Sequence, residues 1–118
     1  IFEQYGLLNV FLITPQTSEA RIRYMDSISD GFIYMVSSAS TTGSQSGFGN
    51  IQTDYFKRIA DLKLTNPQVI GFGISDHETF SQATQYAKGA IIGSAFINYV
   101  TANGVDDLGA FTKPLLNG

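Results

Sequence analysis

The sequence predicts an α/β fold of four parallel strands and intervening helices, which corresponds to half of a closed eight-stranded barrel. Short apolar runs alternate four times with amphipathic segments along the 118 residues, as is typical of parallel strands joined by crossover helices. Apart from Asn9, the runs have no charged or amide side chain, which predicts strands covered on both faces. An eight-stranded barrel needs about 250 residues, so four units make about half of one. An open four-stranded sheet is the alternative, but none of the runs has the polar character of an edge strand.

Each strand and helix is predicted from its own local pattern. The predicted strands cover residues 8–13, 32–36, 69–74 and 90–92. The predicted helices cover residues 18–29, 51–64, a segment from 75 to near 89, a stretch with Ala95, Ile97 and Val100, and an amphipathic segment over 105–116. Ser18 is a favourable N-cap for the first helix, and Ser75 to Glu78 has the spacing of a capping box for the third. Asn66 and Pro67 end the second helix.

Composition and charge exclude several classes of protein. The chain has no cysteine, one histidine and 14% charged residues, so disulfide frameworks and thiolate or histidine metal sites are not expected. The net charge of -3, with no basic stripe, argues against nucleic-acid binding. No apolar run approaches the ~20 residues of a membrane helix, and no secretory signal is visible. We therefore expect a water-soluble, cytoplasmic protein without a bound metal.

Two glycine motifs predict a site for an anion. Gly71 and Gly73 lie at the end of the third strand, and Gly93 and Ser94 follow the fourth. Glycine allows close approach of a ligand to the backbone, and the start of a helix favours negative charge. Either motif alone is also explained by relief of crowding or by a simple turn and N-cap, but their separation by one strand-helix unit favours a phosphate cradle.

Other polar residues have simpler explanations. The Ser/Thr/Gly-rich loop over 37–50 is either a solvated linker or a mobile loop at the active-site end. His77 is expected to be an exposed first-turn residue, and Tyr34 a core aromatic or an apolar pocket wall. The carboxylates expected to be solvated on helices are Glu19, Asp26, Asp30, Asp54 and Asp61.

No carboxylate follows any of the four strands. Their ends carry Thr14, Ser37, Ser75 and Gly93, whereas general acid-base catalysis needs a Glu, Asp, His or Lys in the pocket. The chain therefore offers binding groups and no catalytic residue.

The segments NVFLITPQT, FIYMVSSASTTG, GFGIS and GAIIGSA together resemble the C-terminal half of the tryptophan synthase α subunit family, over essentially the whole chain. The resemblance implies a (β/α)8 TIM barrel, of which residues 1–118 are a single fragment with strands five to eight. It also implies a lyase that cleaves indole-3-glycerol phosphate to indole and glyceraldehyde 3-phosphate, and a β subunit that receives the indole. Pyridoxal phosphate is expected only in that β partner, and the α-type chain has no cofactor.

The same resemblance assigns site residues by motif. Those implied at the phosphate are Gly43, Phe72, Gly73, Gly93 and Ser94. Leu12 and Tyr34 would be apolar walls around the indole ring, and Thr42 would steady the catalytic aspartate on loop closure. The family's catalytic glutamate and aspartate lie on earlier strands, so the isolated chain is expected to be inactive. Ser38 and Ser40 depart from the arginine and glycine usual in this loop.

Two other functions fit the residues. Two half barrels could pair as a self-contained phosphate-binding module, because an open half barrel leaves two unpaired edges. Another phosphate-binding barrel enzyme of tryptophan or histidine biosynthesis would have similar glycine cradles, since one fold hosts many reactions.

Overall fold

The computed structural model describes residues 1–38 and 48–118. One sheet contains the parallel strands β1 (Phe11–Ile13), β2 (Ile33–Val36), β3 (Gln68–Gly71) and β4 (Gly89–Ile91), in the order β1-β2-β3-β4. The helices are η1 (Glu3–Tyr5), α1 (Glu19–Ile28), α2 (Asn50–Asp61), α3 (His77–Thr84), α4 (Ser94–Asn103) and α5 (Gly109–Asn117). The predicted alternation of strands and helices is confirmed.

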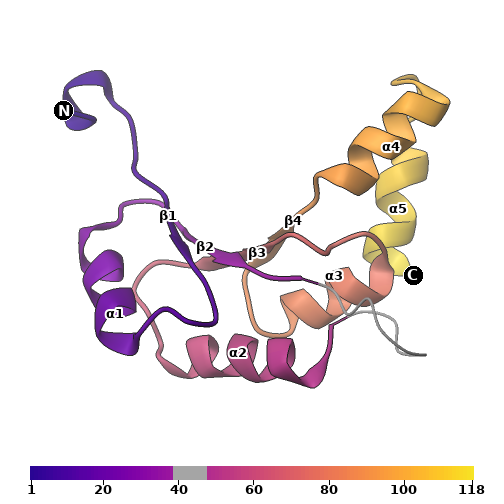
Figure 1. Ribbon diagram of the computed structural model, residues 1–118. Coiled ribbons are helices and arrows are strands. Elements are labelled where there is room, and N and C mark those ends of the chain that lie inside the picture. The colour runs from indigo at the N-terminus through magenta and orange to yellow at the C-terminus, as the bar shows by residue number, and fades with distance from the viewer. Residues whose placement is uncertain (39–47) are drawn as a thin grey trace.

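The helices between strands cover one face of the sheet only. Figure 1 shows α1, α2 and α3 beneath the sheet, while the opposite face lies open between the N-terminal segment and α4 with α5. Sequential strand order with crossover helices on one side is the winding of a barrel, whereas a doubly wound sheet reverses its order and is covered on both faces. The half barrel predicted from the sequence is therefore the observed architecture.

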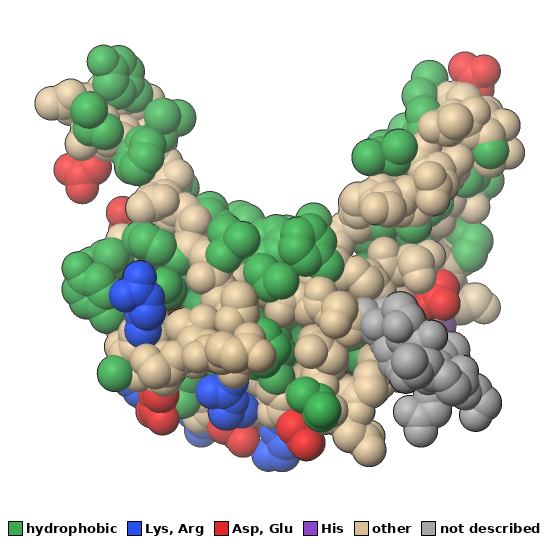
Figure 2. Space-filling view, in the orientation of Figure 1, with side chains coloured by type: hydrophobic (Ala, Val, Ile, Leu, Met, Phe, Trp, Pro, Cys, Tyr) green, Lys and Arg blue, Asp and Glu red, His purple; other side chains and the backbone are tan. Residues whose placement is uncertain are grey.

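The prediction that both strand faces are covered is wrong for the structure as described. Ile13 of β1 and Ile33 of β2 face the helices and are fully buried. Leu12, the residue before Ile13 on β1, points to the opposite face and is 55% exposed. In Figure 2, hydrophobic side chains line the concave upper surface of the sheet. The side chains that would lie inside a closed barrel face solvent here, because alternate residues of a strand point to opposite faces.

The core lies between the sheet and the three crossover helices. Its largest fully buried hydrophobic side chains are Ile13, Ile22, Ile33, Met35, Phe56, Ile59 and Ile70. Phe56 packs edge-on against Phe48, with ring centroids 5.1 Å apart. The hydroxyl group of Tyr55 donates to the carbonyl oxygen of Ile13 at 3.2 Å, so this buried phenol is satisfied by the strand that it covers.

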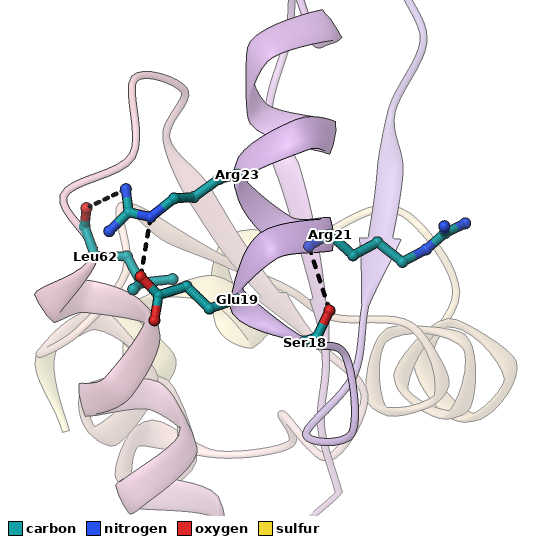
Figure 3. Close-up of polar contacts among 5 residues, drawn as sticks. All are labelled: Ser18, Glu19, Arg21, Arg23 and Leu62. Atoms are coloured by element: carbon teal, nitrogen blue, oxygen red, sulfur yellow. Dashed lines mark hydrogen bonds and ion pairs between the residues drawn. The ribbon is translucent and has the colours of Figure 1, made fainter.

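Helix α1 begins at the predicted N-cap and is tied to the end of α2. The Ser18 hydroxyl accepts from the Arg21 N–H at 3.3 Å, which satisfies one free donor of the first turn. Figure 3 shows Arg23 between Glu19, 3.0 Å away, and the carbonyl group of Leu62, 3.5 Å away. Because these side chains are exposed, the ion pair contributes little stability, at most about 1 kcal/mol.

Asp26 contradicts its predicted solvated position, because it is only 9% exposed. Its carboxylate accepts from the Thr65 N–H at 2.8 Å and from the Asn66 N–H and Nδ2 at 2.9 Å each. Asn66 Nδ2 also donates to the Asp26 carbonyl oxygen at 2.8 Å. Burial alone would raise the pKa of Asp26, but these hydrogen bonds outweigh it and hold the pKa below its usual value. Asp26 thus joins α1 to the loop before β3.

Several predicted boundaries were too long, and one capping register was wrong. Strand β1 begins at Phe11, β3 ends at Gly71, α2 ends at Asp61 and α3 ends at Thr84. The N-cap of α3 is Asp76, whose carboxylate accepts from the Thr79 N–H at 2.9 Å, while the Thr79 hydroxyl accepts from the Asp76 N–H at 3.1 Å. A carboxylate accepts this bond more strongly than a hydroxyl, so Asp76 rather than Ser75 caps the helix.

Helices α4 and α5 form an arm beyond β4. Phe111 contacts Phe96 and Tyr99, with ring centroids 5.5 and 5.3 Å apart. His77 Nδ1 lies 2.7 Å from the Leu115 carbonyl oxygen, which links α5 to the first turn of α3. His77 is exposed, as predicted. Among the helices of the described ranges, none has the length and apolar character needed to cross a membrane.

Candidate functional site

A pocket of about 470 Å³ lies where β3 and β4 end. It is lined by Tyr34, Phe72, Gly73, Ile74, Ser75, Ile91, Gly93, Ser94 and Ala95. The carboxyl ends of parallel strands are the usual place for ligands in α/β barrels, because the loops that follow the strands meet there. This position makes the pocket the candidate functional site.

One wall of the pocket is a left-handed turn at Phe72 and Gly73. Their φ angles are 66° and 74°, and β3 ends at this turn. A non-glycine residue in this region costs about 1–3 kcal/mol, so the surrounding structure must hold Phe72 in place. Within the described chain, neither the Phe72 N–H nor the Gly73 N–H donates to another protein group. Both donors are therefore free for a ligand.

Ser37 holds the turn from the neighbouring strand. Its hydroxyl lies 2.6 Å from the Gly71 carbonyl oxygen and 2.8 Å from that of Phe72, and its N–H donates to the Gly71 carbonyl oxygen at 3.0 Å. The Ser37 side chain is buried beneath the turn. These contacts provide hydrogen-bond donors for two carbonyl groups where the regular pairing of β2 and β3 ends.

Gly71 is required by the packing of Tyr34. A Cβ atom at Gly71 would lie 2.7 Å from Tyr34 Cε1 and still closer to Cζ and the hydroxyl oxygen. The group that approaches the backbone at Gly71 is therefore the tyrosine ring, so relief of crowding explains this glycine. The Tyr34 ring in turn meets Phe72 edge-on, with centroids 5.9 Å apart.

The opposite wall of the pocket is the start of α4. Gly93 is the N-cap, and no side chain caps this helix end. The first N–H groups of a helix have no partner within the helix, and its dipole places partial positive charge there. Ser94 adds a hydroxyl beside these donors. Together with the free N–H groups of Phe72 and Gly73, this helix start can bind an anion.

The pocket lining has binding groups without an acid-base group. Among the described residues that line it, Tyr34 is the only titratable one, and none is Asp, Glu, His or Lys. Over residues 1–38 and 48–118, no cluster of three or more His, Cys, Asp or Glu residues is placed to hold a metal. The described groups can therefore position an anionic substrate, and none of them is an Asp, Glu, His or Lys that could act as general acid or base.

A second pocket, of about 450 Å³, lies at the amino ends of β3 and β4. It is lined by residues 63–68 and 84–88. Helices α2 and α3 end beside it at Asp61 and Thr84, and the C-terminal end of a helix dipole disfavours anions. Lys63 and Lys88 also line this second pocket, so the pocket at the strand carboxyl ends is distinguished as an anion site by its free backbone N–H groups and its helix start.

The sequence model of a protein family described as tryptophan synthase alpha chain matches residues 1–113. The chain belongs to this family. The tryptophan synthase alpha chain of Christiangramia forsetii is 66% identical over 113 residues, which are 96% of this chain and 44% of that protein. The one from Flavobacterium johnsoniae is 72% identical over 104 residues, which are 88% of this chain and 41% of that protein. The chain thus spans less than half the length of these relatives.

Solved structures give the same family. A mutant tryptophan synthase α-subunit from Pyrococcus furiosus has a TM-score of 0.76 and 28% identity, covering 98% of this chain and 47% of that chain. A chain from the tryptophan synthase α2β2 complex of the same organism has a TM-score of 0.74 and 29% identity, covering 96% and 46%. These neighbours are TIM barrels. Their similarity confirms that the four-stranded sheet and helices of this chain form half of such a barrel.

The structure brings together most of the site residues predicted from the sequence. Those that line the one pocket are Tyr34, Phe72, Gly73, Gly93 and Ser94. Leu12 lies opposite Tyr34 in register, on the open face of the sheet and outside the pocket lining. Thr42, Gly43 and Ser40 lie outside the described residues. Ser38 is described, and its N–H donates to Gln52 Oε1 at 3.2 Å.

Sequence analysis missed the part that Ser37 and Ser75 take in the site. The sequence pattern predicts Ser37 only as a strand end and the first residue of the loop over 37–50, although a serine directly after a buried strand and beside a glycine-rich strand end is a usable signal. Ser75 is predicted as a strand end and a helix cap, and the structure shows that it also lines the pocket. Pocket geometry agrees with the predicted residues, while binding of phosphate by this tryptophan synthase α-type chain stays a prediction.

Proposed function

We propose that this chain provides the phosphate-binding half of a tryptophan synthase α-type lyase, which cleaves indole-3-glycerol phosphate to indole and glyceraldehyde 3-phosphate. The observation that carries the proposal is the pocket between the Phe72–Gly73 turn and the start of α4. Its free N–H groups suit a phosphate, because charge-assisted bonds from backbone donors are among the stronger hydrogen bonds. Family membership favours this lyase over other phosphate-binding barrel enzymes.

In this proposal the two ends of the substrate lie on different surfaces. The phosphate accepts hydrogen bonds from the Phe72 and Gly73 N–H groups and from the start of α4 at Gly93 and Ser94. The indole ring lies against Tyr34 and the apolar face of the sheet, and Leu12 extends this face. Gly43 would contribute another phosphate contact, and Thr42 would steady the catalytic aspartate.

Catalysis requires groups that the pocket lining does not contain. We therefore propose that the acid and the base come from the barrel half corresponding to the rest of the relatives' length, and that the isolated chain is inactive. The assembled lyase would bind a β subunit, as the α2β2 complex of the Pyrococcus furiosus relative suggests. We propose that it passes indole to that subunit, which alone would carry pyridoxal phosphate. The absence of cysteine fits a reducing cytoplasm.

Phosphate binding is tested by placing a negative charge in the pocket. Ser94→Asp puts a carboxylate beside the free N–H groups, so we expect titration with inorganic phosphate to show no binding. Asn98→Asp adds the same charge to an exposed position one turn along α4, and its affinity should stay within about twofold of wild type. Equal affinity in wild type and Ser94→Asp would contradict the assignment of the pocket.

The proposal that the catalytic groups lie in the other barrel half is tested by measuring indole formation. We expect no turnover from this chain alone, and turnover after mixing with the separately produced N-terminal part of the Flavobacterium johnsoniae relative. Indole formation by the chain alone, at a rate comparable with a full-length relative, would refute the proposal that its catalytic groups lie elsewhere.

The open apolar face supports a second candidate, a phosphate-binding module made of two copies of the chain. Leu12 and Phe72 are 55% and 60% exposed, and β1 and β4 are both edge strands. Pairing of two half barrels would cover this face and both edges. Light scattering of the purified chain distinguishes the candidates: a dimer mass supports the module, and a monomer mass at micromolar concentration excludes it.

A further inference from the structure

Ser37 contacts the turn at Phe72 and Gly73 from the end of the neighbouring strand. It follows β2, 34 residues before Gly71, and is only 5% exposed. Its hydroxyl has one proton, which is shared between the carbonyl oxygens of Gly71 and Phe72 at 2.6 and 2.8 Å. The Ser37 N–H also donates a hydrogen bond to the Gly71 carbonyl oxygen, with an N–O distance of 3.0 Å.

The two carbonyl groups belong to the peptide units whose N–H groups bind the phosphate in the proposed function. The Gly71 carbonyl shares a peptide plane with the Phe72 N–H, and the Phe72 carbonyl shares one with the Gly73 N–H. A trans peptide unit is planar, so its N–H points opposite to its carbonyl group. By holding both carbonyl groups on its own side, Ser37 turns both N–H groups away from itself. Phe72 and Gly73 line the pocket.

The turn needs this restraint because of the residue at its centre. Phe72 has a φ of 66°, in a region where a residue with a Cβ atom is strained. The relaxed form of Phe72 has a negative φ, which would rotate the adjoining peptide planes and redirect their N–H groups. Restraint of the carbonyl groups on both sides of Phe72 opposes that rotation.

We propose that Ser37 is a positioning residue that aims the Phe72 and Gly73 N–H groups at a bound phosphate by holding the carbonyl groups of Gly71 and Phe72. The inference rests on the proposed function, because it takes the pocket to be the phosphate site. Ser37 does not touch the ligand and acts only through the turn.

The test is titration of the chain with inorganic phosphate, followed by NMR at the Phe72 and Gly73 amide groups. We expect Ser37→Ala to weaken phosphate binding about tenfold, equivalent to ~1.4 kcal/mol. The Phe72 HN–Hα coupling constant, which reports its φ angle, should also change without ligand. Ser29→Ala is the matched control, since Ser29 is 7% exposed and its Oγ has no hydrogen-bond partner in the described structure. Its affinity and the Phe72 coupling should equal those of wild type.

A merely structural role for Ser37 would lower stability and leave the affinity of the folded protein unchanged. Ser37→Thr keeps the hydroxyl group and should restore affinity to within about threefold of wild type, and it decides the question if Ser37→Ala does not fold. Wild-type affinity in folded Ser37→Ala, or a folded Ser37→Thr that loses binding while Phe72 keeps its coupling, would overturn the inference. Absence of phosphate binding by wild type would instead refute the proposed function, and the inference with it.

Discussion

Replacing Asp26 with asparagine removes the charge from a buried junction between α1 and the loop before β3. The carboxylate accepts three hydrogen bonds, one at Oδ2 from Thr65 and two at Oδ1 from Asn66. An asparagine can keep the two bonds at the oxygen position, but its NH2 group would face the Thr65 N–H. Loss of one charge-assisted bond costs about 1.5–3 kcal/mol, and the other two weaken from charged to neutral acceptors. We expect the free energy of unfolding at pH 7 to fall by about 3 kcal/mol.

The measurement is urea denaturation followed by circular dichroism between pH 7 and pH 2. Asp30→Asn is the control, because Asp30 is exposed on the same segment, and it should change stability by less than about 0.5 kcal/mol. The pKa of Asp26 is lowered in the folded state, so its contribution is complete above the unfolded value of about 4 and is lost as the pH falls through the folded pKa. The difference between wild type and Asp26→Asn should shrink over that range. A loss below about 1 kcal/mol at pH 7, or a difference that does not change with pH, would refute the reasoning.

Three further changes test other contacts. Gly71→Ala should lower the free energy of unfolding by about 1–3 kcal/mol in urea denaturation, because the added Cβ atom meets the Tyr34 ring. Gly89→Ala is the control and should not lower it, since its Cβ atom would meet no described atom within 4 Å. Equal effects of the two substitutions would contradict this packing. Tyr55→Phe should lower the free energy of unfolding by about 1 kcal/mol in the same assay. Burial raises the pKa of Tyr55, against the opposing effect of Arg58. The stability of wild type should therefore fall as the pH rises above about 10, and the stability of Tyr55→Phe should fall less. Asp76→Ala removes the α3 N-cap and should cost about 1 kcal/mol, with faster amide exchange in the first turn of α3; unchanged exchange would argue against the cap.

The strands and helices were predictable because each carries its own periodic pattern, but their ends depend on three-dimensional contacts. The apolar run over residues 69–74 predicts a strand of six residues, yet the positive φ angles of Phe72 and Gly73 end β3 at Gly71. A positive φ at phenylalanine cannot be predicted from local preference, since the turn is held by Ser37, which follows a different strand. The local pattern therefore predicts the strand but not the residue at which it ends.

Burial of Asp26 was harder to predict from the sequence than the pocket. The glycine motifs identified Gly73, Gly93 and their neighbours because parallel strands bring their carboxyl ends together. The partners of Asp26 lie 39 and 40 residues further along the chain, so no local pattern reveals them. One signal was present: Asp26 lies four residues after the fully buried Ile22, on the helix stripe that faces the core.

The shared direction of β1 and β4 limits how the sheet can be extended. These strands are the two edges of the sheet, and every pairing within it is parallel. A strand that pairs in parallel with either edge must end at the rim that carries Gly93 and Ser94. Residues that follow such an added strand therefore arrive at the mouth of the pocket, whichever edge the strand joins. Because all strands run in the same direction, residues added at either edge of the sheet can contact a ligand at this rim, from two opposite sides.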